Sequence, residues 1–151
     1  MRVPFAFLAD FGLAHPDGKI YVIGGGLDTI QVPSFPAMHP HITLILKLEF
    51  APTESGQQHT IVIHPLDADG APFLPAATLQ VTPQRNPKFP RLPVGLQYVL
   101  NIQGLLLTKE GEYAFSIVVD GQEVASIPLR IVQGNQPGQQ QLPPAPQPPP
   151  Q

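Results

Sequence analysis

The chain has 151 residues, which allow one domain with a sizeable core but not two domains of ordinary size. Its net charge is −3 and its basic residues are dispersed, so general binding to a phosphate backbone is not expected. The sequence contains no cysteine, which excludes disulfides, thiolate nucleophiles and zinc sites made of Cys ligands. Charged residues make up 13% of the chain, which favours strands and turns over helices with charged faces.

The first apolar segment is interpreted as a strand and not as a targeting signal. Val3–Ala9 spans only seven residues and is followed at once by Asp10. No segment approaches the roughly 18 apolar residues that a membrane-spanning helix requires. We therefore expect a cytoplasmic protein that does not contact a membrane.

The N-terminal third predicts a hairpin followed by a crossing between two sheets. The strand Val3–Ala9 leads to a turn at His15–Gly18 and a returning strand at Lys19–Ile23, in which Pro and Gly suit the turn. A glycine triplet, Gly24–Gly26, then interrupts the pattern, which is typical of a bulge or a bend between sheets. The alternation resumes at Leu27–Val32.

The clearest strand follows a proline-rich crossing loop at Val32–Pro40. It covers His41–Phe50 and alternates apolar residues on one face (Ile42, Leu44, Leu46, Leu48 and Phe50) with a second face that we expect to be mostly in water (His41, Thr43, Ile45, Lys47 and Glu49). A turn at Pro52–Gly56 leads into the next predicted strand, His59–His64, whose core side is Ile61 and Ile63.

The C-terminal half continues with short strands and ends in a strong hairpin signal. A turn at Asp67–Gly70, a strand at Ala76–Thr82, a loop at Pro83–Pro93 and a strand within Gly95–Leu107 come in that order. The segments Glu112–Val119 and Glu123–Val132 flank Asp120-Gly121, which supplies the positive-φ residues of a tight turn. Tyr113 stands where β-sandwiches place a ring whose hydroxyl bonds back to the preceding corner. Pro75 and Pro128 each lack the backbone N–H that a strand donates to its neighbour. This predicts that their strands run along a sheet edge at these positions.

These elements predict an all-β fold. About eight or nine strands at spacings of about 8–12 residues, without a helical period, are typical of a β-sandwich. We expect a single antiparallel β-sandwich, immunoglobulin-like or jelly-roll-like, over residues 1–133. Residues 134–151 contain no charged residue and consist mainly of Pro and Gln, so we expect a disordered tail.

The histidines provide one candidate metal site. His39 and His41 are close in sequence, and His64 could lie across a hairpin from the strand of His41, with Asp67 in a turn near it. Imidazoles with carboxylates suit zinc or another divalent ion. However, their spacing matches no known ligand pattern, and we prefer the interpretation that these are solvated side chains at strand ends. We expect no metal and no cofactor.

The loop Pro83–Pro93, called the basic loop below, is the candidate contact site. It places Arg85, Lys88 and Arg91 around Phe89 on a segment stiffened by prolines. Such a loop suits an anionic or peptide partner because a segment that is already stiff loses little conformational entropy on binding. In the alternative interpretation, Phe89 covers one end of the sandwich and the three cations are simply solvated.

Several local motifs together resemble an uncharacterised family of short bacterial β-sandwich proteins of unknown function. The resemblance covers residues 1–133 and rests on the segments Phe7–Asp10, Asp17–Gly24, Phe35-Pro36, Gly111–Tyr113 and Asp120-Gly121. These motifs lie in turns and strand starts, so the resemblance implies a fold but no functional residue.

The sequence contains no catalytic motif, and we expect a protein that is not an enzyme. The preferred hypothesis is a non-enzymatic binding or assembly module of a bacterial cell, with a protein partner. One alternative is a metal-dependent enzyme that uses His39, His41, His64 and Asp67. Another is an exported ligand-binding β-sandwich, although the absence of Trp and the presence of only three Tyr argue against a carbohydrate ligand.

Overall fold

Strands dominate the computed structural model, which describes residues 1–134. The predicted disorder of the tail therefore concerns residues that, from 135 onward, lie outside the described part of the chain. The described residues form one short 3-10 turn, η1 (Pro52–Glu54), and nine strands: β1 (Arg2–Ala14), β2 (Ile20–Gly25), β3 (Thr29–Val32), β4 (Ala37–Phe50), β5 (His59–Asp67), β6 (Ala77–Val81), β7 (Val94–Leu107), β8 (Gly111–Val119) and β9 (Gln122–Gln133).

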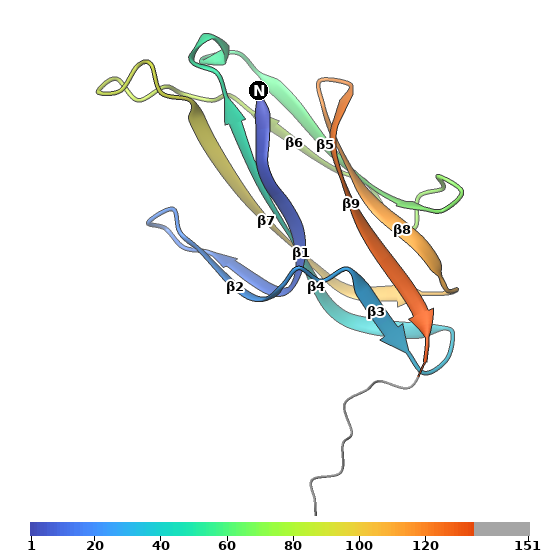
Figure 1. The fold of residues 1–151 in the computed structure, drawn as a ribbon. Coiled ribbons are helices and arrows are strands. Elements are labelled where there is room, and N and C mark those ends of the chain that lie inside the picture. The colour runs from blue at the N-terminus through green and yellow to red at the C-terminus, as the bar shows by residue number, and fades with distance from the viewer. Residues whose placement is uncertain (135–151) are drawn as a thin grey trace, which may run out of the picture.

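The strands form two sheets that face each other. One sheet has the order β2-β1-β4-β7, and the other has the order β3-β9-β8-β5-β6 (Figure 1). Side chains from both sheets meet in one apolar core, which includes Leu44 and Leu46 of the first sheet and Ile61 and Phe115 of the second. The predicted all-β class with two layers is thus confirmed.

The predicted inner face of β4 is confirmed, but the prediction for its outer face is wrong. Leu44, Leu46 and the other predicted core residues of this strand are fully buried. Thr43 and Ile45 were expected in water and are also fully buried. An extra layer of chain on the outer side of the sheet explains this burial.

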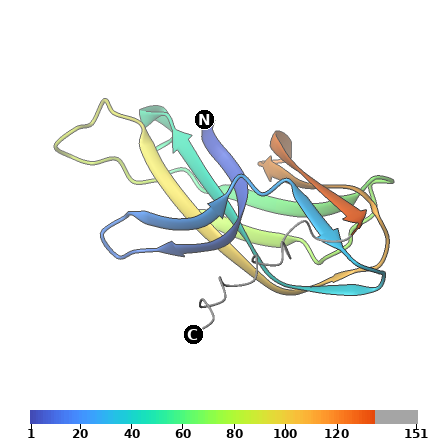
Figure 2. The same ribbon diagram turned by 60° about the horizontal axis from the view of Figure 1, so that its bottom comes forward.

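That extra layer is the hairpin made by the C-terminal half of β1 and by β2. Up to Ala9, β1 pairs with β4, and from Ala9 onward it pairs with β2. A Cβ atom on Gly12 would lie 2.9 Å from Cγ2 of Thr43 and 3.3 Å from Cγ1 of Val99 in β7. The backbone of the hairpin therefore packs directly against side chains of the first sheet, on the side away from the second sheet (Figures 1 and 2).

The chain crosses to the second sheet through the predicted glycine triplet. Gly24 and Gly26 have φ values of 64° and 86°, which glycine adopts at little cost. The crossing delivers β3 alongside β9, and these two strands run parallel. The expectation of a purely antiparallel sandwich is wrong for this pair, because the bend brings the chain to the second sheet in the direction of β9.

The C-terminal hairpin matches its prediction closely. Asp120 and Gly121 both have positive φ in the turn between β8 and β9. The hydroxyl of Tyr113 donates a hydrogen bond of 3.0 Å to the carbonyl of Lys109, which is the predicted corner contact. Pro128 pairs with Ala114 of β8 and precedes the segment of β9 that pairs with β3, so its missing N–H leaves no gap in that ladder.

Helical structure in residues 1–134 is limited to the three-residue turn η1. Accordingly, this part of the chain contains no helix that is long and apolar enough to cross a membrane.

Candidate binding site

The basic loop connects the two sheets at one end of the molecule, from the end of β6 to the start of β7. Its first residues rest on the turn that follows η1. The N–H of Gly56 donates to the carbonyl of Pro83 at 2.8 Å, and the N–H of Arg85 donates to Oγ of Ser55 at 3.0 Å. The base of the loop is therefore fixed to the body of the domain.

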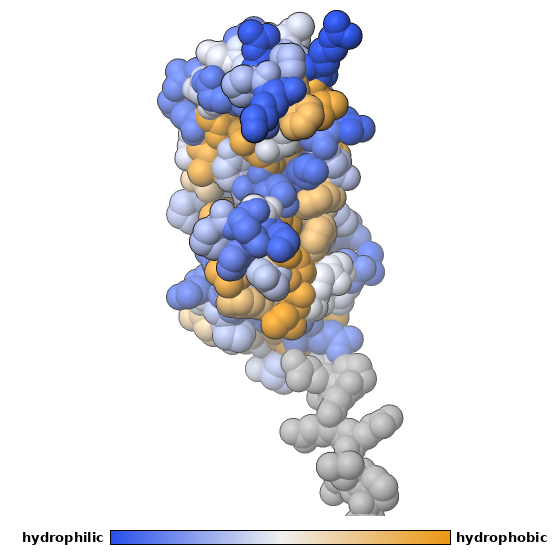
Figure 3. Space-filling model, turned by 90° about the vertical axis from the view of Figure 1, so that its left-hand side faces the viewer, coloured by the Kyte–Doolittle hydropathy of each residue, from blue (hydrophilic) through white to orange (hydrophobic). Residues whose placement is uncertain are grey.

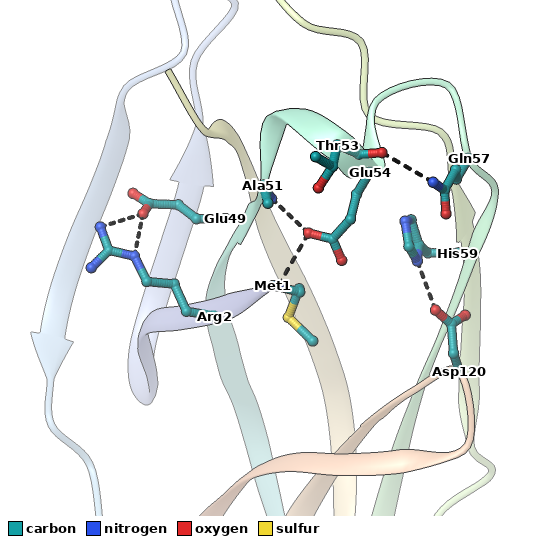
Figure 4. Close-up of polar contacts among 9 residues, drawn as sticks. All are labelled: Met1, Arg2, Glu49, Ala51, Thr53, Glu54, Gln57, His59 and Asp120. Atoms are coloured by element: carbon teal, nitrogen blue, oxygen red, sulfur yellow. Dashed lines mark hydrogen bonds and ion pairs between the residues drawn. The ribbon is translucent and has the colours of Figure 1, made fainter. Parts of the chain in front are cut away.

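The turn that supports the loop is itself held by polar contacts (Figure 4). The carboxylate of Glu54 accepts the N–H of Ala51 at 2.6 Å and lies 3.1 Å from the N-terminal amine of Met1. The side-chain amide of Gln57 donates to the carbonyl of Thr53 at 3.0 Å. These contacts make the turn a firm platform beneath the basic loop.

A second polar pair lies next to this platform. Nδ1 of His59 lies 2.6 Å from Oδ2 of Asp120 (Figure 4). The ring of His59 packs against Phe50, with 4.7 Å between the ring centroids. The contact with His59, together with a bond from the N–H of Thr60, holds the pKa of Asp120 below its ordinary value. The pair ties β5 to the β8–β9 turn.

The outer part of the basic loop is shaped by its own turns. Asn86 accepts the N–H of Lys88 on its side chain at 2.9 Å and the N–H of Phe89 on its carbonyl at 3.0 Å. The carbonyl of Phe89 in turn accepts the N–H of Leu92 at 3.1 Å. The loop thus has a defined shape before any partner is present, which lowers the entropic cost of binding.

The structure places Phe89 on the surface and not over the core. Phe89 is 57% exposed, so the alternative in which it covers the end of the sandwich is wrong. Leu92, which the sequence reasoning did not select, is 59% exposed, and together with Asn86 it borders a surface hollow of about 270 Å³ beside Phe89. The sequence could have indicated this exposure, because Leu92 lies between Pro90 and Pro93 and outside the alternating pattern of the strands.

The cations of the basic loop differ from the other basic residues of the chain. The remaining five (Arg2, Lys19, Lys47, Lys109 and Arg130) each lie within 4 Å of a carboxylate. Within residues 1–134, no carboxylate lies within that distance of Arg85, Lys88 or Arg91. The loop therefore presents a positive charge that the described protein does not neutralise.

The candidate metal residues lie on different sheets. His39 and His41 belong to β4, whereas His64 and Asp67 belong to β5 in the opposite sheet. The expectation that His64 lies across a hairpin from His41 is wrong, because β5 pairs with β6 and β8. Nδ1 of His41 instead donates a hydrogen bond of 2.8 Å to the carbonyl of Asp10. Over residues 1–134, no three His, Cys, Asp or Glu side chains are grouped as metal ligands would be.

The hairpin of β1 and β2 carries an exposed apolar face that the sequence reasoning also missed. Phe11 pairs with Ile23 and Leu13 with Tyr21, and all four side chains are exposed. The side of the molecule seen in Figure 3 shows hydrophobic surface between hydrophilic patches. The sequence offered no distinction, since alternating apolar residues on a hairpin look the same whether their face is covered or not.

The comparisons with known proteins agree with the resemblance seen in the sequence. No curated protein and no solved structure matches the chain. The model of one family matches residues 4–132, which include β2 to β8 completely and all of β1 and β9 except Arg2, Val3 and Gln133. The chain therefore belongs to the family described as "Family of unknown function (DUF6941)".

Proposed function

We propose that the protein is a non-enzymatic binding module that holds an acidic segment of a protein partner on the basic loop. The observation that carries this proposal is the contrast in charge pairing: every basic side chain outside the loop has a carboxylate within 4 Å, and Arg85, Lys88 and Arg91 have none among the described residues. An acidic partner would supply the missing carboxylates.

The apolar side chains of the loop indicate how such a partner would be anchored. Exposed Phe89 and Leu92 flank the cations, and an aromatic residue with neighbouring Arg is the composition enriched at interface hot spots. The fixed base and internal turns of the loop limit the entropy lost on binding. We therefore expect the partner segment to combine Asp or Glu with at least one large apolar residue.

Strand order supports an immunoglobulin-like form of the sandwich over a jelly roll. The order β1-β4-β7 corresponds to strands A, B and E of that fold, and β9-β8-β5 corresponds to G, F and C. The corner bond of Tyr113 lies at the start of the strand that corresponds to F. An experimental structure with a different strand order would contradict this assignment.

We also propose that the protein resides in the bacterial cytoplasm. A sequence free of cysteine fits a reducing compartment, and the sequence motifs resemble short bacterial proteins. Fractionation of the native cell would test it, and recovery of the protein outside the cytoplasm would contradict it.

A peptide array tests the binding proposal directly. The full chain would be applied to acidic peptides that carry one Phe or Leu, and to matched peptides with Asn and Gln in place of Asp and Glu. We expect retention on the acidic peptides, falling as salt rises from about 50 to about 500 mM because exposed charges are screened. Replacing Arg85, Lys88 and Arg91 by Gln should abolish retention, and Phe89→Ala should weaken it.

A control with the same change in net charge separates the loop from the overall charge. Arg2, Lys19 and Arg130 lie outside the loop and each contacts a carboxylate. Replacing these three by Gln should leave retention unchanged. Equal losses in the control and loop variants, or equal retention of the amide peptides, would contradict the proposal.

A further inference from the structure

The strand β7 forms a long free edge. It pairs with β4 from Val94 to Leu107 except at Gly104, and it is the edge strand of its sheet. Every second residue of an edge strand turns its N–H and C=O groups away from the sheet, and these groups can pair with another strand. Because β7 has 14 residues, its outward N–H and C=O groups extend over a much greater length than those of a short edge strand.

The chain protects its other edges but not this one. In the described residues, the other terminal strands β2, β3 and β6 have only six, four and five residues. Short edge strands are one device against pairing, and charged residues and Pro are others. The sequence of β7 contains neither a charged residue nor a Pro. This edge is therefore open to strand addition.

An apolar opening lies beside the same edge. A cavity of about 220 Å³ lies between the two sheets, lined on one side by Leu100 and Ile102 of β7 and on the other by Leu74 and Ala77 near β6. A strand added to β7 would extend the first sheet next to this opening, and its inward side chains would shield the apolar lining from water. Added apolar burial would stabilise the pairing.

The charges at the two ends of β7 indicate which strand is added. Arg91 lies three residues before the strand and Glu110 three residues after it, and both are exposed. Neither has an ion-pair partner within residues 1–134. Antiparallel pairing of two copies of β7 about its centre would bring the end that carries Arg91 in each copy beside the end that carries Glu110 in the other. The strand itself contains no charged residue, and the adjacent Lys109 already lies 3.3 Å from Oδ2 of Asp67.

We propose that β7 is a dimerisation edge, at which a second copy of the chain pairs antiparallel about a two-fold axis. The two four-stranded sheets become one continuous sheet of both copies, and attraction between the Arg91 end of one copy and the Glu110 end of the other favours the antiparallel orientation. This interface goes beyond the binding proposed for the basic loop. The two share Arg91, but Phe89 and Lys88 are not needed for the dimer, so loss of peptide binding in Phe89→Ala is distinguishable from loss of the dimer.

Charge reversal tests the proposal in solution. Sedimentation equilibrium of the full chain should show a monomer–dimer equilibrium. Arg91→Glu or Glu110→Arg alone places like charges at both contacts, and each should weaken the dimer by about tenfold or more. The double variant should dimerise like wild type. A mixture of the two single variants should also dimerise, because each contact between the two different copies then joins one carboxylate to one guanidinium.

Two measurements connect this result to the strand itself. Amide hydrogen exchange should show protection of outward N–H groups in β7 in wild type that is lost in each single variant. Arg130→Glu, in β9 of the second sheet, is the matched charge-reversal control and should leave the dimer unchanged. Phe89→Ala should dimerise normally even if peptide binding is lost. If the wild-type chain stays monomeric at all concentrations, the proposal is overturned. The same holds if β7 of that monomer pairs only with a strand of another protein. A dimer that ignores the charge reversals would also overturn it.

Discussion

Ile45 and Leu46 are neighbours in β4 whose side chains point to opposite faces of one sheet, and both are fully buried. Leu46 faces the core between the sheets, whereas Ile45 faces the backbone of the first hairpin at Gly12. At the scale of single residues, the strand therefore depends on two apolar environments. The next residue, Lys47, keeps partial exposure and lies 3.4 Å from Glu49.

Alanine substitutions should reproduce this pattern. We expect Leu46→Ala and Ile45→Ala each to lower the free energy of unfolding by about 2–5 kcal/mol, since both remove buried methylene groups. Lys47→Ala should cost less than about 1 kcal/mol because its ion pair is near the surface. Urea denaturation of the three variants measures these changes. If Ile45→Ala were as mild as Lys47→Ala, the hairpin would not cover this face in solution.

Asp120 provides a pH-dependent contribution at the same scale. Its pKa lies below the ordinary value of 3.8, first because of the contact with His59. A depressed pKa means that the fold favours the carboxylate, so this stabilisation is present above pH 3.8 and is lost as the pH falls through the lower folded pKa. Asp120→Asn tolerates the same positive φ, and it should be less stable than wild type at neutral pH.

The measurement for Asp120 is a series of melting temperatures from neutral to strongly acidic pH. The difference between wild type and Asp120→Asn should be largest at neutral pH and should shrink as the wild-type carboxylate becomes protonated. A constant difference across the series would show that the contact with His59 does not favour the ionised form.

At the scale of elements, the hairpin of β1 and β2 works as a third layer. Its tip is also attached to the first sheet, since the side-chain amide of Gln97 in β7 donates to the carbonyl of Gly18 at 3.2 Å. Its inner side packs on the sheet through Gly12, while Phe11 and Leu13 on β1 remain exposed. The absence of a side chain at Gly12 is what allows this close approach.

A side chain at Gly12 should therefore disturb the layer. Gly12→Val would place methyl groups against Thr43 and Ile45, and overpacking of this kind typically costs about 1–3 kcal/mol. The adjacent variant Leu13→Ala changes an exposed residue and should cost less than about 0.5 kcal/mol. Thermal unfolding of both variants measures the contrast. Equal stabilities would mean that the hairpin can move away from the sheet without loss.

For the whole molecule, local patterns were sufficient to predict most strands but not their arrangement. The inner face of β4, the turn at Asp120-Gly121 and the corner at Tyr113 depend on neighbouring residues, and each was predicted correctly. The hairpin layer, the parallel pairing of β3 and the separation of His41 from His64 depend on contacts between distant segments. Hydrophobic periodicity carries no information about such contacts.

The candidate site was predictable to a similar extent. The sequence placed three cations and Phe89 on one loop, because composition and prolines are local features. It did not reveal that Phe89 is exposed, or that the other five basic residues have acidic neighbours, since some of those partners are remote in sequence, as Glu49 is from Arg2. The electrostatic contrast of the loop arises only when the chain is folded.

The parallel pairing of β3 with β9 also determines when the domain can be completed during synthesis. Thr29 pairs with Arg130, and Val32 pairs with Gln133. The strand β3 therefore cannot pair with β9 until residues 130–133 have been synthesised. Chains emerge from the ribosome N-terminus first, and contacts between such distant segments form slowly. While the rest of the chain is being translated, β3 remains unpaired with Ile30 and Val32 uncovered, and β9 is the last of the described strands to emerge.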